Sequence, residues 1–129
     1  MATYHDPQDV TLGGTALAGV LEIRYGVTAE PVTASGDGQT HASVVVRGPG
    51  VCRGELVFRD PVQAQTAAGR GGTLTAKLKG LGSAADKTLT IYGVRVLTEE
   101  AHVTRTRQAG CLLRFAAARD DGTDPAIVA

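Results

Sequence analysis

The chain has 129 residues, 13 basic and 13 acidic side chains, and a hydrophobic fraction of 43%. This length fits one domain with its own core, which we place at residues 1–129. The zero net charge argues against a general nucleic-acid binder, because such proteins carry a basic excess. With three Tyr, two Phe and no Trp, large core residues are scarce. Part of the apolar surface is therefore expected to be buried between subunits.

The first segment, residues 1–9, is predicted to be an extended arm. Pro7 fixes one backbone angle, and no periodic apolar pattern precedes Val10. These residues are polar and do not resemble a signal peptide, and no apolar run in the chain approaches the length of a membrane span. A turn at Gly13-Gly14 then leads into a predicted strand over residues 17–27, whose apolar and charged positions alternate.

Residues 28–40, TAEPVTASGDGQT, form the longest stretch without a core pattern. Gly, Pro, Ser, Asp and Thr dominate it, so we predict a long loop or a flexible hairpin tip. The strand SVVVR follows, and Gly48-Pro49-Gly50 is predicted to be a turn. In the next strand, VCRGELVFR, Gly54 is predicted to mark a bulge.

One helix is predicted, at about residues 60–68. Asp60 can cap it, Pro61 suits its first turn, and the glycine-rich sequence GRGG from Gly69 ends it. A helix this short must be held by packing onto a sheet. The strictly alternating sequence TLTAKLK, residues 73–79, then predicts another strand.

The longest strand-forming stretch is 87–124. Residues 88–97 and 110–119 each have apolar side chains on both faces, which predicts central strands, and the first of them is expected to be covered on both sides. Between them, residues 102–107 (HVTRTR) alternate as polar residues and predict an exposed or lumen-facing strand. The whole chain therefore predicts a mainly β fold, a sandwich or barrel of about seven or eight antiparallel strands with one short flanking helix.

No catalytic or metal-binding constellation is present in the sequence, and we expect neither an enzyme nor a cofactor. The three histidines, His5, His41 and His102, have no triad or ligand partner at a useful local spacing. The sequence DDGTD, residues 120–124, lacks the remaining ligands of a calcium loop. Cys52 and Cys111 both lie in apolar strand patterns, which favours two buried thiols over a disulfide without excluding the latter.

The order and spacing of the elements resemble the tail tube proteins of tailed bacteriophages, whose fold is shared with type VI secretion tube proteins. Four segments carry the resemblance, and together they span most of the chain: DVTLGGTALAGVLEI, RGELVFRDPVQAQTAAG, GTLTAKLKG with KTLTIYGVRV, and CLLRFAAARDDGTDP. The resemblance implies a structural subunit that forms rings, commonly hexameric, stacked into a tube through whose lumen DNA passes.

The resemblance also implies roles for particular residues. The loop 28–40 would contact the next ring, and the arm would reach a neighbouring subunit; the polar strand is the candidate lumen or subunit surface. The residues are Pro31, Val32, Thr33 and Asp37 for the inter-ring contact, Tyr4, His5 and Asp6 for the arm, and His102, Thr104, Arg105 and Arg107 for the lumen or interface.

The implied partners are further copies of the chain, sheath, baseplate and terminator proteins, and DNA in passive contact. The implied location is the virion tail, assembled in the host bacterial cytoplasm, without a membrane partner. Two alternatives stay open: another tail component of related fold (a distal tail, tail-terminator or baseplate protein), or a stand-alone β-sandwich binding module. The absence of Trp counts against sugar stacking in such a module.

Overall fold

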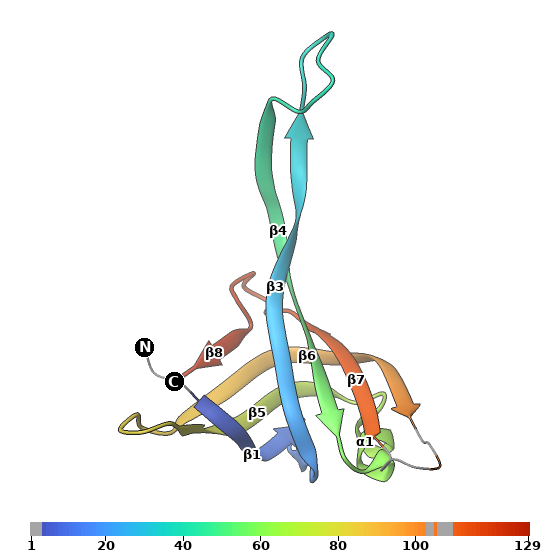
Figure 1. Ribbon diagram of the computed structural model, residues 1–129, viewed down its shortest axis with the longest axis vertical. Helices are drawn as coiled ribbons and strands as arrows, with labels where there is room; N and C mark the ends of the chain where they lie inside the picture. The colour runs from blue at the N-terminus through green and yellow to red at the C-terminus, as the bar shows by residue number, and fades with distance from the viewer. Residues whose placement is uncertain (1–3, 103–104, 106–109) are drawn as a thin grey trace.

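The computed structural model describes residues 4–102, 105 and 110–129. This part of the chain is mainly β, with eight antiparallel strands in one sheet and one short helix (Figure 1). The elements are β1 (Tyr4–Leu12), β2 (Thr15–Ala16), β3 (Val20–Ala34), β4 (Val44–Phe58), α1 (Pro61–Ala67), β5 (Gly71–Gly80), β6 (Lys87–His102), β7 (Gly110–Ala117) and β8 (Ala126–Val128). The predicted fold class is confirmed, but the sheet is not closed into a barrel.

The strands follow the order β2-β1-β5-β6-β7-β4-β3, and β8 pairs with β6 beside this path. The sheet curves until β1 contacts β3, although no hydrogen-bonded ladder joins them. A two-residue turn with positive φ at Gly13 and Gly14 connects β1 to β2, as predicted. The curvature leaves a core face inside and an outer face turned to solvent.

The core lies on the inner face of the sheet. Its largest fully buried side chains are Phe58, Phe115, Leu12, Leu56, Leu74, Leu89, Ile91 and Leu113. Helix α1 covers one end of this core through Ala64 and Ala67, and it contacts β4, β6 and β7. The carboxylate of Asp60 accepts a hydrogen bond from the amide of Val62 at 2.9 Å, which is the predicted N-cap.

The alternation of inward-facing and outward-facing side chains along β6 shifts at Gly93. Leu89 and Ile91 are buried, and so is Val94, which simple alternation would place on the other face. Gly93 has a φ of +62°, a left-handed conformation that shifts the alternation by one residue. The prediction that the strand over residues 88–97 is covered on both sides is therefore wrong. Strands β6 and β7 are central, as predicted, but the outer face of β6 exposes Tyr92 and Leu97.

The predicted N-terminal arm is instead a strand of the sheet. Residues 4–12 form β1 and pair with β5, beginning with Tyr4 opposite Gly80 and His5 opposite Lys79. The register shifts twice along this ladder, and Asp9 has a φ of +49°. Backbone pairing within the sheet is the physical reason that this segment is fixed without an apolar pattern of its own.

The predicted loop 28–40 is also largely strand. Strand β3 continues to Ala34, and the connection to β4 comprises only residues 35–43. The predicted turn at Gly48-Pro49-Gly50 lies within β4, where the pairing shifts register between Ala29 and Pro31. A bulge thus takes the place of the turn, and the two strands form one long hairpin.

The polar segment 102–107 is only partly described. His102 ends β6, where it pairs with Gly110 at the start of β7, and Arg105 is exposed. Thr104 and Arg107 lie outside the described residues.

The two cysteines are free thiols, both buried. Cys52 pairs with Ala117 and Phe58 pairs with Cys111, so the two thiols are separated by six positions along the β4–β7 ladder. At about 3.3 Å per residue this separation is roughly 20 Å, far beyond the reach of a disulfide.

We expect stability to fall as the pH rises above about 9. Burial raises the pKa of Cys111, and burial together with Asp124 raises that of Cys52, both from an ordinary value of 9.0. The folded state therefore keeps these protons more tightly than the unfolded chain. The stabilisation is complete below the unfolded pKa and is lost as the pH rises through the folded one. Thermal unfolding between pH 7 and 10.5 measures this loss.

A Cys52→Ala/Cys111→Ala variant is the control for this pH dependence. Its melting temperature should start lower, because two small cavities replace the thiols, but should vary less between pH 9 and 10. A decline equal to that of the unmodified protein would show that the thiols are not its source.

Candidate functional site

The feature that sets this molecule apart from a compact β domain is the β3–β4 hairpin. It projects far beyond the rest of the sheet in Figure 1. Its base belongs to the sheet, because residues 52–58 of β4 pair with β7. We call residues 31–34 and 44–47 the distal ribbon; they pair only with each other. A two-stranded ribbon without further packing is at best marginally stable in water.

The two faces of the distal ribbon differ in chemistry. Directly opposed residues share a face, so Val32 lies beside Val46 and Ala34 beside Val44. These four residues form what we call the apolar face. The opposite face carries two other pairs, Pro31 with Arg47 and Thr33 with Val45. Val32 is 59% exposed and Val46 56%, so the apolar face lies open to solvent in the single chain.

The tip of the hairpin is held by local hydrogen bonds. The Gly36 amide donates to the Gln39 side-chain oxygen, and the Gln39 amide donates back to the Gly36 carbonyl at 3.2 Å. The Ser43 amide donates to the Ala34 carbonyl at 2.9 Å and closes the hairpin. Asp37 is thus presented at the far end of the ribbon, well away from the core.

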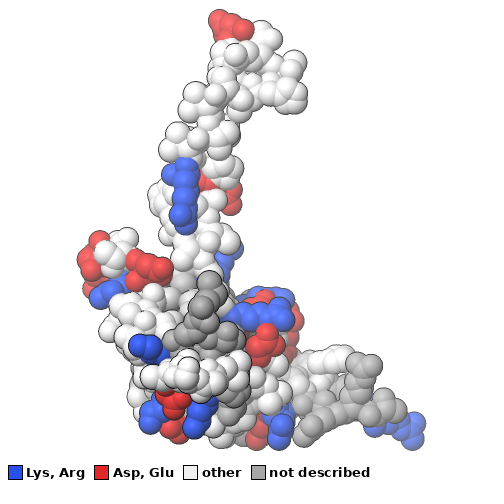
Figure 2. Space-filling view, turned by 60° about the vertical axis from the view of Figure 1, so that its left-hand side comes forward, with Lys and Arg blue, Asp and Glu red and all other residues white. Residues whose placement is uncertain are grey.

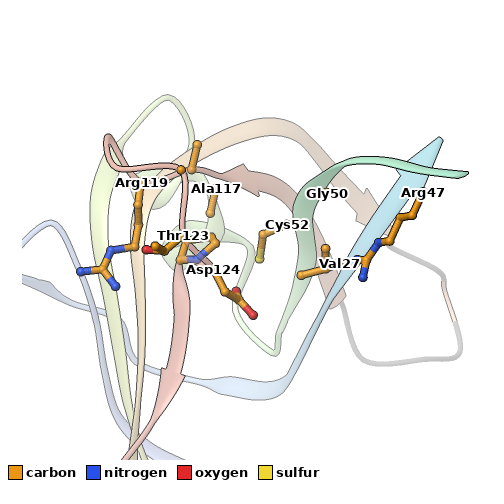
Figure 3. Close-up of a pocket in the computed structure, with 11 residues that line it drawn as sticks. Val27, Arg47, Gly50, Cys52, Ala117, Arg119, Thr123 and Asp124 are labelled. Carbon is orange, nitrogen blue, oxygen red and sulfur yellow. The ribbon is translucent and has the colours of Figure 1, made fainter. Parts of the chain in front are cut away.

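A cavity of about 370 Å³ lies at the base of the hairpin (Figure 3). Val27, Cys52 and Ala117 provide apolar walls, and Asp124 and Arg47 provide charge. The Arg119 guanidinium extends away from Cys52 and Val27, and it stacks on the ring of Tyr92, 4.6 Å from the ring centre.

The side chains around the cavity at the base of the hairpin do not favour a reactive nucleophile. Burial and the nearby Asp124 raise the pKa of Cys52, which disfavours the reactive thiolate. Burial, Asp124 and Cys52 likewise raise the pKa of Tyr25. No group of three or more His, Cys, Asp or Glu side chains suited to a metal ion occurs among the described residues. Within the same residues, no helix has the length and hydropathy needed to cross a membrane.

The outer face of the sheet carries a chain of alternating charges. Arg24, Glu55 and Arg114 lie directly opposite one another on β3, β4 and β7. Arg114 donates to Glu55 at 3.3 Å and to Glu100 at 2.9 Å, and Arg24 donates to Glu22. Hydrogen bonding to Glu55 and the charge of Glu100 raise the pKa of Arg114. Because these groups are exposed, the network orders the surface more than it stabilises the fold.

An arginine-rimmed groove of about 480 Å³ crosses this outer face. Its rim is formed by Arg24, Arg53 and Arg114 with Glu55, and Leu97 is its exposed apolar residue, whereas Phe115, which also borders it, is buried in the core. Leu97 is 59% exposed. Figure 2 shows blue and red atoms mingled on the body of the molecule and few of either on the projecting hairpin.

The structure places the sequence-predicted site residues in three separate regions. Pro31, Val32 and Thr33 lie in the exposed distal part of β3, with Asp37 in the tip. Tyr4, His5 and Asp6 begin β1, at the opposite end of the strand order from β3. His102 ends β6, and Arg105 lies in the connection between β6 and β7. No cavity described above unites these sets.

Sequence reasoning predicted the strand SVVVR but missed its pairing with β3 in one long hairpin. Val44 and Val46 complete the apolar face, but the assumed turn at residues 48–50 hid their pairing with β3. The consecutive valines of SVVVR were the available signal, because such a run is typical of a strand with apolar side chains on both faces. The arginine-rimmed groove was also missed, since its residues come from four strands.

Comparison with known proteins adds no relative. No protein-family model matches the chain, and a search of curated proteins finds no match either.

Proposed function

We propose that the chain is a structural subunit of a phage tail tube, or of a tail-like tube, that assembles with copies of itself into stacked rings. The observation that carries this proposal is the distal ribbon, an extended hairpin whose apolar face is exposed in the described part of the chain. Exposed apolar surfaces of this kind mark interaction sites in soluble proteins. The order and spacing of the elements resemble those of tail tube proteins, and this resemblance indicates the kind of assembly, a tube of stacked rings.

The open sheet supports the same proposal. Strand β3 ends the strand order, and β1 is paired on its outer side only at Thr11 and Leu12. Unpaired edges are a hazard in a small β protein unless another strand or subunit covers them. A ring of subunits pairs or shields such edges, and the balanced charge of the chain permits dense packing.

Direct binding of the hairpin to DNA is the less favoured use of this ribbon. A two-stranded ribbon fits the major groove, but residues 28–50 carry only Glu30, Asp37 and Arg47 as charged side chains. This balance is slightly acidic and repels phosphate. Protein is therefore the favoured partner of the ribbon.

Shortening the hairpin tests the proposal. Exchanging residues 30–49 for Asn-Gly joins the opposed pair Ala29 and Gly50 by a two-residue turn. We expect the free energy of unfolding of the single chain to change little, because none of the removed residues belongs to the buried core. Assembly into species larger than a monomer, measured by sedimentation velocity, should be lost.

A second exchange is the matched control. Replacing only residues 35–43 by Asn-Gly removes the tip and joins Ala34 to Val44, so the apolar face stays intact. This variant should still assemble if the valines rather than the tip make the contact. Unchanged assembly of the chain lacking residues 30–49 would contradict the assigned role of the hairpin.

A further inference from the structure

The distal ribbon and the outer face of the sheet carry complementary surfaces. We propose that the apolar face of the distal ribbon of one copy packs into the arginine-rimmed groove of a second copy. This inference rests on the proposed self-assembly and deepens it by naming the surface that receives the ribbon.

Both surfaces expose apolar side chains that can pack against each other. The ribbon offers Val32 and Val46 side by side, and the groove offers Leu97 as its exposed apolar residue. The groove, at about 480 Å³, is wide enough to receive more than one valine side chain. Packing the ribbon there removes exposed apolar area from water on both copies, which favours association.

The charges are complementary as well. The ribbon has one acidic residue before its apolar face, Glu30, and one beyond it, Asp37. Three arginines surround the groove, and Arg53 makes no ion pair with any residue in the described part of the chain. In the proposed contact, Glu30 and Asp37 at the two ends of the ribbon therefore approach a rim on which the Arg53 guanidinium is available for an ion pair.

We assign the groove's occupant to a second copy, because within one chain the apolar face and the groove lie on the same two strands. Arg24 and Arg53 lie in the sheet-bound part of β3 and β4, and the apolar face lies farther out on the same two strands. The paired strands run past the bulge near Ala29 and extend away from their own base, so the apolar face does not reach the groove of the same chain. Since donor and acceptor surfaces differ, the contact is head-to-tail. It repeats from copy to copy and generates a ring or a stack instead of a closed pair.

Disulfide trapping between two single variants tests the contact. Val46→Cys places a thiol on the apolar face, and Thr98→Cys places one in the groove. The two purified variants are mixed under mild oxidation, and covalent dimers are quantified on non-reducing gels and mapped by mass spectrometry. We expect a 46–98 cross-link in the mixture, several-fold above the dimer formed by either variant alone.

Val45→Cys is the matched control, since it is exposed on the other face of the same ribbon. It should give little cross-link with Thr98→Cys. Equal trapping from positions 45 and 46, or dimers formed by Val46→Cys alone, would overturn the inference. So would rings seen by microscopy without any 46–98 cross-link, although the proposed function would then stand. Absence of any assembly would reject both.

Discussion

Replacing Gly93 by Ala is expected to lower the free energy of unfolding by about 3 kcal/mol. Two costs combine at this position. An L-residue is strained at the φ of +62°, and an added Cβ would collide with the carbonyl oxygen of Ala118. The carbonyl cannot move freely, because Ala118 follows β7 directly and its amide donates to the Gly93 carbonyl at 3.4 Å.

Gly82→Ala is the matched control for Gly93→Ala. Gly82 has a similar φ of +65°, but an added Cβ there meets no atom within 4 Å. Its substitution should cost only the conformational strain, about 1 kcal/mol. Urea unfolding followed by circular dichroism, in the variant lacking residues 30–49, measures both without interference from assembly. Equal losses for the two variants would show that the contact with the Ala118 carbonyl adds nothing to the cost at Gly93.

Replacing Phe58 by Ala is expected to cost about 4 kcal/mol. Phe58 is fully buried, lies between Val20 and Cys111 in the ladder, and ends the strand that leads into α1. Removing its ring leaves a cavity where the hairpin base and the helix join the core, and this site cannot collapse without moving a strand. Urea unfolding gives the loss, provided that the slope with denaturant stays constant.

Phe58→Leu separates packing from any role of the aromatic ring. Leucine fills part of the same space, so its loss should be well below that of alanine. Similar losses for the two variants would contradict the account of Phe58 as a space-filling core residue.

The sequence predicted the mainly β class and the helix because their signals are local. Asp60 and Pro61 mark the helix start, and the alternation of residues 73–79 marks β5 without reference to any partner. Cys52 and Cys111 were rightly placed in apolar strands, and the register shows that they cannot bridge.

The errors have a common cause in long-range pairing. The sequence of residues 28–34 is typical of a loop, yet it is held in β3 by a partner strand ten or more residues away. The composition of Gly48-Pro49-Gly50 is typical of a turn, but these residues lie at a bulge within β4. Gly54, predicted as a bulge, lies in a regular ladder and makes room for the Arg24 carbonyl and the Phe115 ring.

The candidate site could be predicted only in part, because it too depends on long-range strand pairing. Val32 was singled out through the resemblance, but its neighbour Val46 follows only from the register. The groove requires Arg24, Arg53, Leu97 and Arg114 to meet across β3, β4, β6 and β7. Such a meeting of four strands depends on topology, which local patterns do not encode.

Electron microscopy of the purified chain in negative stain tests the central claim most directly. If the protein is a tube subunit, concentrated samples should show rings or stacked tubes with a central hole, and the variant lacking residues 30–49 should show none. A monodisperse monomer at high concentration, confirmed by sedimentation, would contradict the proposed function.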